Sequence, residues 1–205
     1  MIEVITSNTP GCLLSADMLD SMFRLRTTVF SDRLGWDVDC VGGREIDRFD
    51  DLDPTYMVVR DRVQPNIALG CWRLLPSTGP YMLRDVFPEL LDGRCAPDDP
   101  RVWEISRYAI AASGQAAGLG FGFGEISVAM WRRLFRFSRE AGIDAFVGVT
   151  SIAVERMVRK LGLGFHRLGG ARRYGGVPNI AFSIPMDAQA EAALGTRPED
   201  TQRAA

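Results

Sequence analysis

The sequence predicts one mixed α/β domain in which a sheet is flanked by helices. Stretches rich in β-branched and aromatic residues alternate with stretches of helical periodicity, and some neighbouring strands are joined by turns short enough for hairpins. A chain of 205 residues is also long enough to bury roughly 70% of its unfolded surface in one core. The domain is expected to span residues 1–187, and the Ala-, Gln- and Glu-rich segment 188–205 is expected to fray.

The N-terminal half predicts a helix, a loop and two paired strands. Residues 16–33 carry apolar side chains at close to helical spacing, and the helix is expected to end at Gly35. Residues 36–54 form an acidic, glycine-containing loop. Residues 56–60 and 67–75 are strand-like and are joined by a turn. A short strand at residues 1–6 and a short helix near residues 85–91 complete this half.

The C-terminal half begins with the predicted central strand, residues 102–112, which is aromatic, β-branched and flanked by Pro and Gly. A glycine-rich turn at residues 114–124 leads into a long helix at 125–141. The remaining predicted elements are a strand at 145–150, a helix at 152–161, and strands at 165–168 and 180–186.

Composition excludes several classes of protein. With 24 Lys and Arg against 26 Asp and Glu, the net charge is −2, so general nucleic-acid binding is not expected. No apolar run approaches 18 residues and the N-terminus lacks a signal-peptide layout, which predicts a cytoplasmic protein without a membrane span. The scattered cysteines and a single histidine predict neither a disulfide framework nor a metal site: Cys12, Cys40, Cys71, Cys95 and His166.

Charged residues inside apolar stretches are the strongest functional signal. Glu104 and Arg107 lie three residues apart in the predicted central strand, and Arg73 is the only charge in 67–75. Such charges are retained when they are paired or used. On a regular strand, Glu104 and Arg107 point to opposite faces unless a bulge intervenes, so two separate ion pairs remain one reading. In the functional reading, Glu104 is a general base whose pKa is raised by burial, and Arg107 binds a ligand.

Two aspartates in the acidic loop are candidates for ligand binding. Asp47 and Asp50 interleave with apolar residues that would hold the loop against a core. Carboxylates held in this way can bind an ammonium or sulfonium centre, or can receive an arginine fork from Arg73. A solvated loop with ordinary turns is the alternative.

An aromatic pair near the first helix predicts a cleft wall. Arg26 lies one helical turn before Phe30, so both can face the same side, and with Trp36 they could contact an adenine ring or a cation. A glycine pattern at Gln115–Gly120 could cradle a phosphate at a helix N-terminus, as in coenzyme-A loops, and a plain connecting turn explains it equally well.

Taken together, these residues resemble the acyl-homoserine-lactone synthases, the LuxI-type autoinducer synthases, over roughly residues 20–170. Ser77 stands where threonine is commoner in the family, and residues 115–124 are unusually glycine-rich. The matching segments are Arg26–Phe30, Arg33–Trp36, Glu45–Asp50, Arg73–Ser77, Pro80–Leu83, Asp85–Pro88, Trp103–Arg107, Gly148–Thr150 and Glu155–Gly162.

The resemblance implies a fold similar to the GCN5-related N-acetyltransferases and two substrates. One is S-adenosylmethionine, which is a substrate and not a cofactor; the other is an acyl chain on acyl carrier protein, or on coenzyme A in a minority of members. It implies that Glu104 is the catalytic base. The residues implied in S-adenosylmethionine binding are Arg26, Phe30, Trp36, Asp47, Asp50, Arg73 and Arg107.

The resemblance also implies an apolar acyl pocket, for which Met82, Trp103, Phe146 and Thr150 are the expected walls. In the family, a threonine like Thr150 is associated with the substituent at acyl C3. The alternative function is a coenzyme-A-dependent N-acyltransferase of the GCN5-related superfamily. Exposed basic residues would dock the acidic carrier protein, and a solvated helix face is the alternative reading of the same set: Arg132, Arg133, Arg136, Arg139, Arg156, Arg159 and Lys160.

Overall fold

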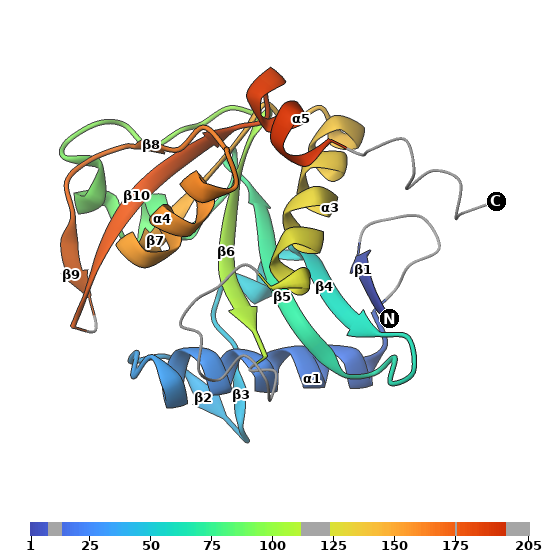
Figure 1. Ribbon diagram of the computed structural model, residues 1–205. Coiled ribbons are helices and arrows are strands. Elements are labelled where there is room, and N and C mark those ends of the chain that lie inside the picture. Colours follow the sequence, from blue (N-terminus) through green and yellow to red (C-terminus); the bar gives the residue numbers. More distant parts are fainter. Residues whose placement is uncertain (8–13, 112–123, 175, 196–205) are drawn as a thin grey trace.

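The computed structural model describes residues 1–7, 14–111, 124–174 and 176–195, and it has a twisted, mostly antiparallel sheet with helices on both faces (Figure 1). The strands follow the order β1-β4-β5-β6-β7-β10-β8, with β9 paired to β10 and a separate β2–β3 hairpin. The strands are β1 Ile2–Thr6, β2 Cys40–Val41, β3 Arg44–Glu45, β4 Thr55–Asp61, β5 Ala68–Pro76, β6 Val102–Ile110, β7 Ala145–Ser151, β8 His166–Arg167, β9 Arg172–Tyr174 and β10 Val177–Pro185.

The helices begin and end where the sequence supplies caps. Ser15 accepts a hydrogen bond from the Met18 amide, and Ser151 accepts one from Val154, so each caps a helix N-terminus. Gly142, with φ of 68°, ends the long helix in the left-handed conformation. The helices are α1 Ala16–Thr27, a π-helical turn Thr28–Arg33, α2 Met82–Asp85, α3 Glu125–Ala141, α4 Ile152–Lys160, α5 Ala188–Leu194, and 3₁₀ turns Asp50–Leu52 and Pro88–Leu91.

The sheet separates two sets of buried side chains, as the two-residue period of a strand requires. Met57 packs with the core beneath α3, α4 and α5, whereas its neighbour Val58 packs with α1 on the opposite face. A third cluster forms where α2 brings Leu83 against Val147. This arrangement confirms the predicted mixed α/β class.

Strands β6 and β7 lie side by side only at one end. They pair in parallel over three positions, from Val102 opposite Ala145 to Glu104 opposite Val147, and no pairing continues beyond Glu104. Gly148 is the next residue of β7, and a Cβ built there would lie 2.5 Å from the Ile105 carbonyl oxygen. Glycine therefore permits the close approach from which the two strands diverge.

Several segments differ from the sequence-based expectation, among them the β2–β3 hairpin, which lies within residues 36–54 that were expected to be loop. Residues 188–194 form helix α5, which buries Ala190 and Leu194 against the core beneath α3, so this part of the tail does not fray. Strand β9 is also additional to the predicted set. The glycine-rich turn at 114–124 lies, except for Gly124, outside the described residues. Within the described ranges, no helix is both long and apolar enough to cross a bilayer.

Candidate active site

Three arginines and three carboxylates form a closed ion network on the face of the sheet that α1 covers. Arg26, fully buried on α1, donates Nε to Glu45 at 2.5 Å and both terminal nitrogens to Asp50 at 2.8 Å. The second bond set is bidentate, which is the strongest geometry for this pair of groups. The α1 helix and the loop after β3 are thereby held together at the site.

The other two arginines come from the sheet and share Asp47. Arg73 on β5 contacts Asp47 at 2.5 Å and Asp50 at 3.1 Å. Arg107 on β6 contacts Asp47 at 2.6 Å and Glu45 at 2.9 Å. The six groups carry three positive and three negative formal charges, so the network is neutral as a whole.

A β-bulge in β6 brings Arg107 to this face. The β5–β6 register shifts at this point, and Arg107 has φ of 55°, which is uncommon for a residue other than glycine. Ile105 and Tyr108 therefore both pack toward the α3 side, while Glu104 and Arg107 both face the α1 and α2 side. The bulge that the sequence analysis left open is present, and it unites two side chains that a regular strand would separate.

The network shifts the pKa values of its members. Burial by itself raises the pKa of Asp50. The hydrogen bonds and charge of Arg26, together with the charge of Arg73, outweigh burial, so the pKa of Asp50 lies well below its ordinary value of 3.8. Burial also raises the pKa of Asp47, but the hydrogen bond from Arg73 and the charges of Arg73 and Arg107 outweigh burial, so the pKa of Asp47 is lowered. Tyr56 donates its hydroxyl to Asp50 at 2.7 Å; burial, then the Asp50 charge, raises the Tyr56 pKa.

Glu104 lies apart from the six-membered network and is almost completely buried, with 1% exposure. Its two carboxylate oxygens accept the backbone amides of Met82 at 3.1 Å and Leu83 at 2.7 Å, at the start of α2. Burial raises the pKa of Glu104, and the two amides and the charges of Arg73 and Arg107 oppose that rise. A carboxyl group with a raised pKa near two fixed cations is suited to proton transfer close to neutrality.

The aromatic residues stand beside the arginines. Phe30 and Trp36 stack on each other with centroids 5.3 Å apart, and the Arg107 guanidinium lies 5.4 Å from the Phe30 centroid. Phe30 lies in the π-helical turn Thr28–Arg33, a geometry that often occurs at functional sites. Met82 places its sulfur 3.0 Å from Arg73 and 3.2 Å from Arg107. All eight charged and aromatic residues expected for S-adenosylmethionine and catalysis are therefore close together.

A narrow pocket of about 40 Å³ opens between the diverging strands, on the α3 and α4 side. Of the four expected acyl-pocket residues, Thr150 lines it. Phe146 and Trp103 do not line this pocket. Phe146 is fully buried in the same core, and Trp103 contacts Phe137. Met82 is on the opposite side of the sheet, against the arginines. The lining is Trp72, Ile105, Ser106, Arg107, Tyr108, Trp131, Val149, Thr150, Val154, Val158, Phe165, Phe182 and Ile184.

Three site residues were not selected from the sequence. Glu45 bridges Arg26 and Arg107, Tyr56 binds Asp50, and the Ser106 hydroxyl accepts a bond from Arg73 Nε at 3.2 Å. Glu45 could have been found, because it precedes Asp47 by two residues in the same acidic segment. The roles of Tyr56 and Ser106 depend on strand register and carry no separate sequence signal.

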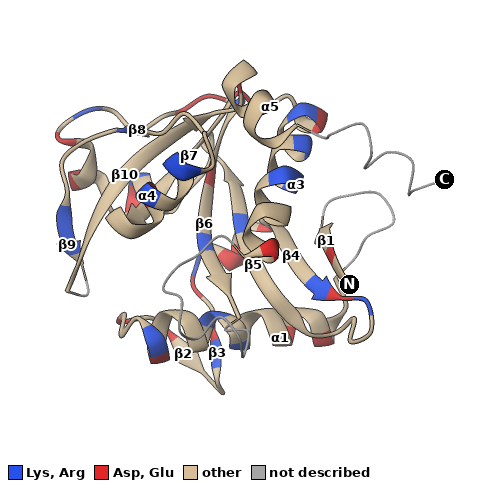
Figure 2. Ribbon diagram, viewed as in Figure 1, with Lys and Arg blue, Asp and Glu red and all other residues tan. Residues whose placement is uncertain are grey.

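The described residues include no group of three or more His, Cys, Asp and Glu side chains arranged to hold a metal ion. The possible phosphate-binding loop at Gln115–Gly120 lies outside the described residues. Of the expected docking residues, Arg133 contacts Glu140 and Arg159 contacts Glu155. The exposed members are Arg132, Arg136, Arg139, Arg156, Arg159 and Lys160, on α3 and α4 (Figure 2).

Curated proteins with a similar sequence are named acyl-homoserine-lactone synthases. One from Pseudomonas aeruginosa is 41% identical over 177 residues, which are 86% of this chain and 87% of that protein. The crystal structure of the synthase LasI superposes with a TM-score of 0.80 at 36% identity, covering 95% of this chain and 93% of LasI.

A coenzyme-A-dependent synthase, BjaI, solved with S-adenosylmethionine and isopentyl-coenzyme A, has a TM-score of 0.79 at 26% identity, covering 95% of this chain and 87% of BjaI. A putative N-acetyltransferase from Lactobacillus plantarum, 16% identical with a TM-score of 0.58, shares the fold alone, over 91% of this chain and 99% of that protein. The family model for autoinducer synthases matches residues 11–194. The chain therefore belongs to the autoinducer synthase family, whose named relatives are acyl-homoserine-lactone synthases.

Proposed function

We propose that this enzyme acylates the amine of S-adenosylmethionine from an acyl thioester and then closes the lactone, releasing 5′-methylthioadenosine. The observation that supports the proposal is that the neutral ion network, the buried Glu104 and the pocket between β6 and β7 lie next to one another. Ser106 and Arg107 belong both to the network side and to the pocket lining. A polar amino-acid substrate and an apolar acyl chain can therefore meet at one bulge of β6.

In the first step, the substrate amine attacks the thioester carbonyl carbon, so a C–N bond forms and the C–S bond breaks. The amine must lose its proton, and Glu104 takes it directly or through a water molecule. The nitrogen loses a second proton as the tetrahedral adduct collapses, and the leaving thiolate takes up a proton and is released as the thiol. A backbone amide of the sheet would donate a hydrogen bond to the tetrahedral oxyanion.

In the second step, the methionyl carboxylate attacks the carbon attached to the sulfonium, and the C–S bond breaks to release 5′-methylthioadenosine. The sulfonium is a good leaving group, and the five-membered ring brings the reacting atoms together. The chain's contribution is to hold the carboxylate near the carbon. Arg26, Arg73 and Arg107 order this part of the site through Glu45, Asp47 and Asp50, with Phe30 and Trp36 as the wall for the adenine.

The acyl donor is an acyl group on acyl carrier protein. The exposed arginines and Lys160 on α3 and α4 lie on the helices that cover the pocket, and carrier proteins of this type are acidic. BjaI shows that this fold also accepts coenzyme-A donors. Both substrates are cytoplasmic metabolites, so the enzyme is assigned to the cytoplasm.

The test is to incubate the purified chain with S-adenosylmethionine and a panel of acyl thioesters. The expected products are free thiol, 5′-methylthioadenosine and an acyl-homoserine lactone in equal amounts, identified by mass spectrometry. Thiol release from acetyl-coenzyme A with an ordinary amine, but none with S-adenosylmethionine, would instead support a general N-acyltransferase and contradict the proposal.

A further inference from the structure

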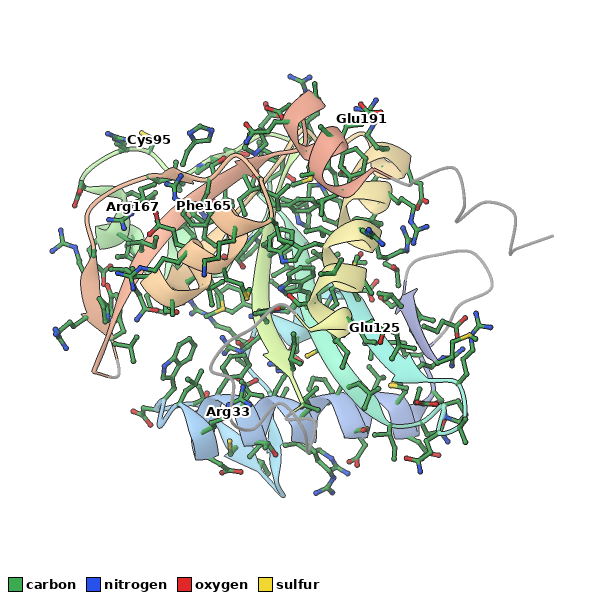
Figure 3. The ribbon with its side chains drawn as sticks, in the orientation of Figure 1. Arg33, Cys95, Glu125, Phe165, Arg167 and Glu191 are labelled. Atoms are coloured by element: carbon green, nitrogen blue, oxygen red, sulfur yellow. The ribbon has the colours of Figure 1, made fainter. Side chains whose placement is uncertain are left out.

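The thioether sulfur of Met82 accepts hydrogen bonds from two arginines of the ion network. The network lies among the side chains that fill the space between α1 and the sheet (Figure 3). Arg73 Nη2, from β5, is 3.0 Å from the sulfur, and Arg107 Nη1, from β6, is 3.2 Å from it. Two cationic N–H groups from neighbouring strands therefore point at one atom.

A thioether is a poor match for these two donors. Methionine sulfur is a weak acceptor, whereas guanidinium groups form their strong hydrogen bonds with carboxylates. In Arg107, Nε and Nη2 bind the carboxylates of Glu45 and Asp47. The Met82 sulfur is the only hydrogen-bond acceptor of Arg107 Nη1 among the described residues. The point where the two N–H groups meet is therefore suited to an anionic oxygen.

The Met82 side chain can leave this point without disturbing the main chain. It is half-buried, and an unbranched methionine side chain turns easily about its rotatable bonds. The backbone is held separately, because the Met82 amide donates to Glu104 Oε2 at 3.1 Å and the Leu83 amide donates to Oε1 at 2.7 Å. The sulfur can therefore move away from the arginines while α2 keeps its bonds to Glu104.

Under the proposed function, the anion that reaches this point is the α-carboxylate of S-adenosylmethionine. The α-carboxylate and the α-amine are attached to the same carbon, so they stay close to each other. Met82 contacts the arginines through its sulfur and Glu104 through its amide, so one residue spans the distance between them. A carboxylate bound by the two N–H groups therefore keeps the amine near the proposed base.

We propose that the Met82 thioether stands where the substrate carboxylate binds, and that it turns away when the carboxylate takes over the N–H groups of Arg73 and Arg107. Met82 is then a specificity-determining residue for the amino-acid substrate, because a weak acceptor covers the two cations and yields to a carboxylate. This inference rests on the proposed function, and it assigns Met82 to the S-adenosylmethionine site and not to the acyl pocket.

The experiment measures dissociation constants by calorimetry, without an acyl donor, for S-adenosylmethionine and decarboxylated S-adenosylmethionine. The two ligands share the adenosine, the sulfonium and the amine, and they differ only in the carboxylate. Met82→Gln supplies a stronger acceptor on a side chain of similar length, and it is expected to weaken S-adenosylmethionine binding about tenfold, with a smaller effect on the decarboxylated ligand. Met82→Leu has similar volume and no acceptor, and it is expected to bind S-adenosylmethionine at least as tightly as the wild type.

The comparison of the two substitutions separates displacement from packing, because a loss of packing would weaken both ligands in both variants. Arg84→Gln is the control: it places the same amide two residues further along α2 and is expected to leave the ratio of the two dissociation constants unchanged. Equal effects of Met82→Gln on both ligands, or selective weakening of S-adenosylmethionine by Met82→Leu, overturns the inference. A wild type that releases no methylthioadenosine with any thioester would instead contradict the proposed function.

The methyl resonance of Met82 reports the displacement directly. It is assigned in protein labelled with ¹³C-methyl methionine by its loss in Met82→Leu. At saturation, S-adenosylmethionine is expected to shift this resonance more than the decarboxylated ligand does, because only the carboxylate displaces the sulfur from the arginines. Equal shifts with both ligands would contradict the displacement.

Discussion

At the scale of single residues, the site depends on charges that are stable only together. Arg26 and Arg73 are fully buried, and each would be costly to bury without its carboxylate partners. The sequence identified Arg73 because it interrupts an apolar stretch, with Asp47 and Asp50 as its possible partners, and it identified Arg26 from its helical spacing to Phe30. Glu45 completes the balance of three charges against three, and its position on the β2–β3 hairpin brings it between Arg26 and Arg107.

Replacing Asp50 tests how strongly the network stabilises the fold. Because the native pKa of Asp50 is lowered, its contribution is complete above about pH 4 and is lost as the pH falls through the native value. Asp50→Asn is expected to lower the free energy of unfolding by about 3–5 kcal/mol at pH 7. Urea titrations at pH 7, 5 and 3 should show this difference shrinking only at the lowest pH.

Asp51→Asn is the matched control, since Asp51 is the exposed neighbour on the same 3₁₀ turn. Its effect is expected to stay within about 0.5 kcal/mol at each pH. A difference between the wild type and Asp50→Asn that does not vary with pH would show that the Asp50 charge is not the stabilising feature.

Replacing Glu104 tests its assignment as the base. Glu104→Gln is expected to lower kcat/KM for methylthioadenosine release about 10²-fold or more at pH 7. Glutamine also disturbs the Met82 and Leu83 amide contacts, so the pH dependence must separate the two effects. Without a base, the reaction needs amine that is already deprotonated, and an α-amino group has a pKa of about 8. The ratio of wild-type to Glu104→Gln kcat/KM should therefore fall between pH 7 and pH 9.

A deficit that is the same at every pH would identify Glu104 as the anchor of α2 and not as the base. The raised pKa of Glu104 makes a second measurement possible. The wild-type kcat/KM should fall on acidification through that raised value, since protonated Glu104 cannot accept the amine proton.

At the scale of elements, the sequence predicts long segments with a sustained apolar period. It does not predict segments whose structure depends on packing against other elements. The helix at 125–141 matches α3 because its apolar spacing is sustained over the whole segment. Helix α5 has only Ala190 and Leu194 buried, and β9 has three residues, so neither has enough periodicity to detect. The bulge at Arg107 is likewise set by the packing of both faces of β6, and no local residue marks it.

The approach of β6 and β7 can be tested at Gly148. A methyl group there would lie 2.5 Å from the Ile105 carbonyl oxygen, which is backbone and cannot rotate away. Gly148→Ala is expected to lower the free energy of unfolding by about 1–3 kcal/mol through overpacking. Gly79→Ala is the control, because a Cβ there has no atom within 4 Å. Equal stability of the two variants in urea titrations would show that the strands do not approach so closely.

At the scale of the whole molecule, the sheet divides the chemistry between its faces. The ion network and Glu104 lie on the α1 and α2 side, the pocket that we propose for the acyl chain lies on the α3 and α4 side, and the bulge of β6 connects them. The helices over the pocket also carry exposed basic residues, although the whole chain has a net charge of −2. Under the proposed function, this distribution would give an acidic carrier protein a preferred side from which to deliver its acyl chain.

Charge reversal on α4 tests that direction of approach. Arg156 and Lys160 are exposed and four residues apart, so both lie on one helix face. The double variant Arg156→Glu, Lys160→Glu is expected to raise the KM for acyl carrier protein about tenfold or more, with a smaller effect at high salt. The KM for S-adenosylmethionine and turnover of acyl-pantetheine, which has no carrier protein, should be unchanged.

Arg62→Glu, in the β4–β5 turn, is the control. An equal loss with acyl-pantetheine would place the effect in the active site, and an unchanged carrier-protein KM would exclude this face as the docking surface.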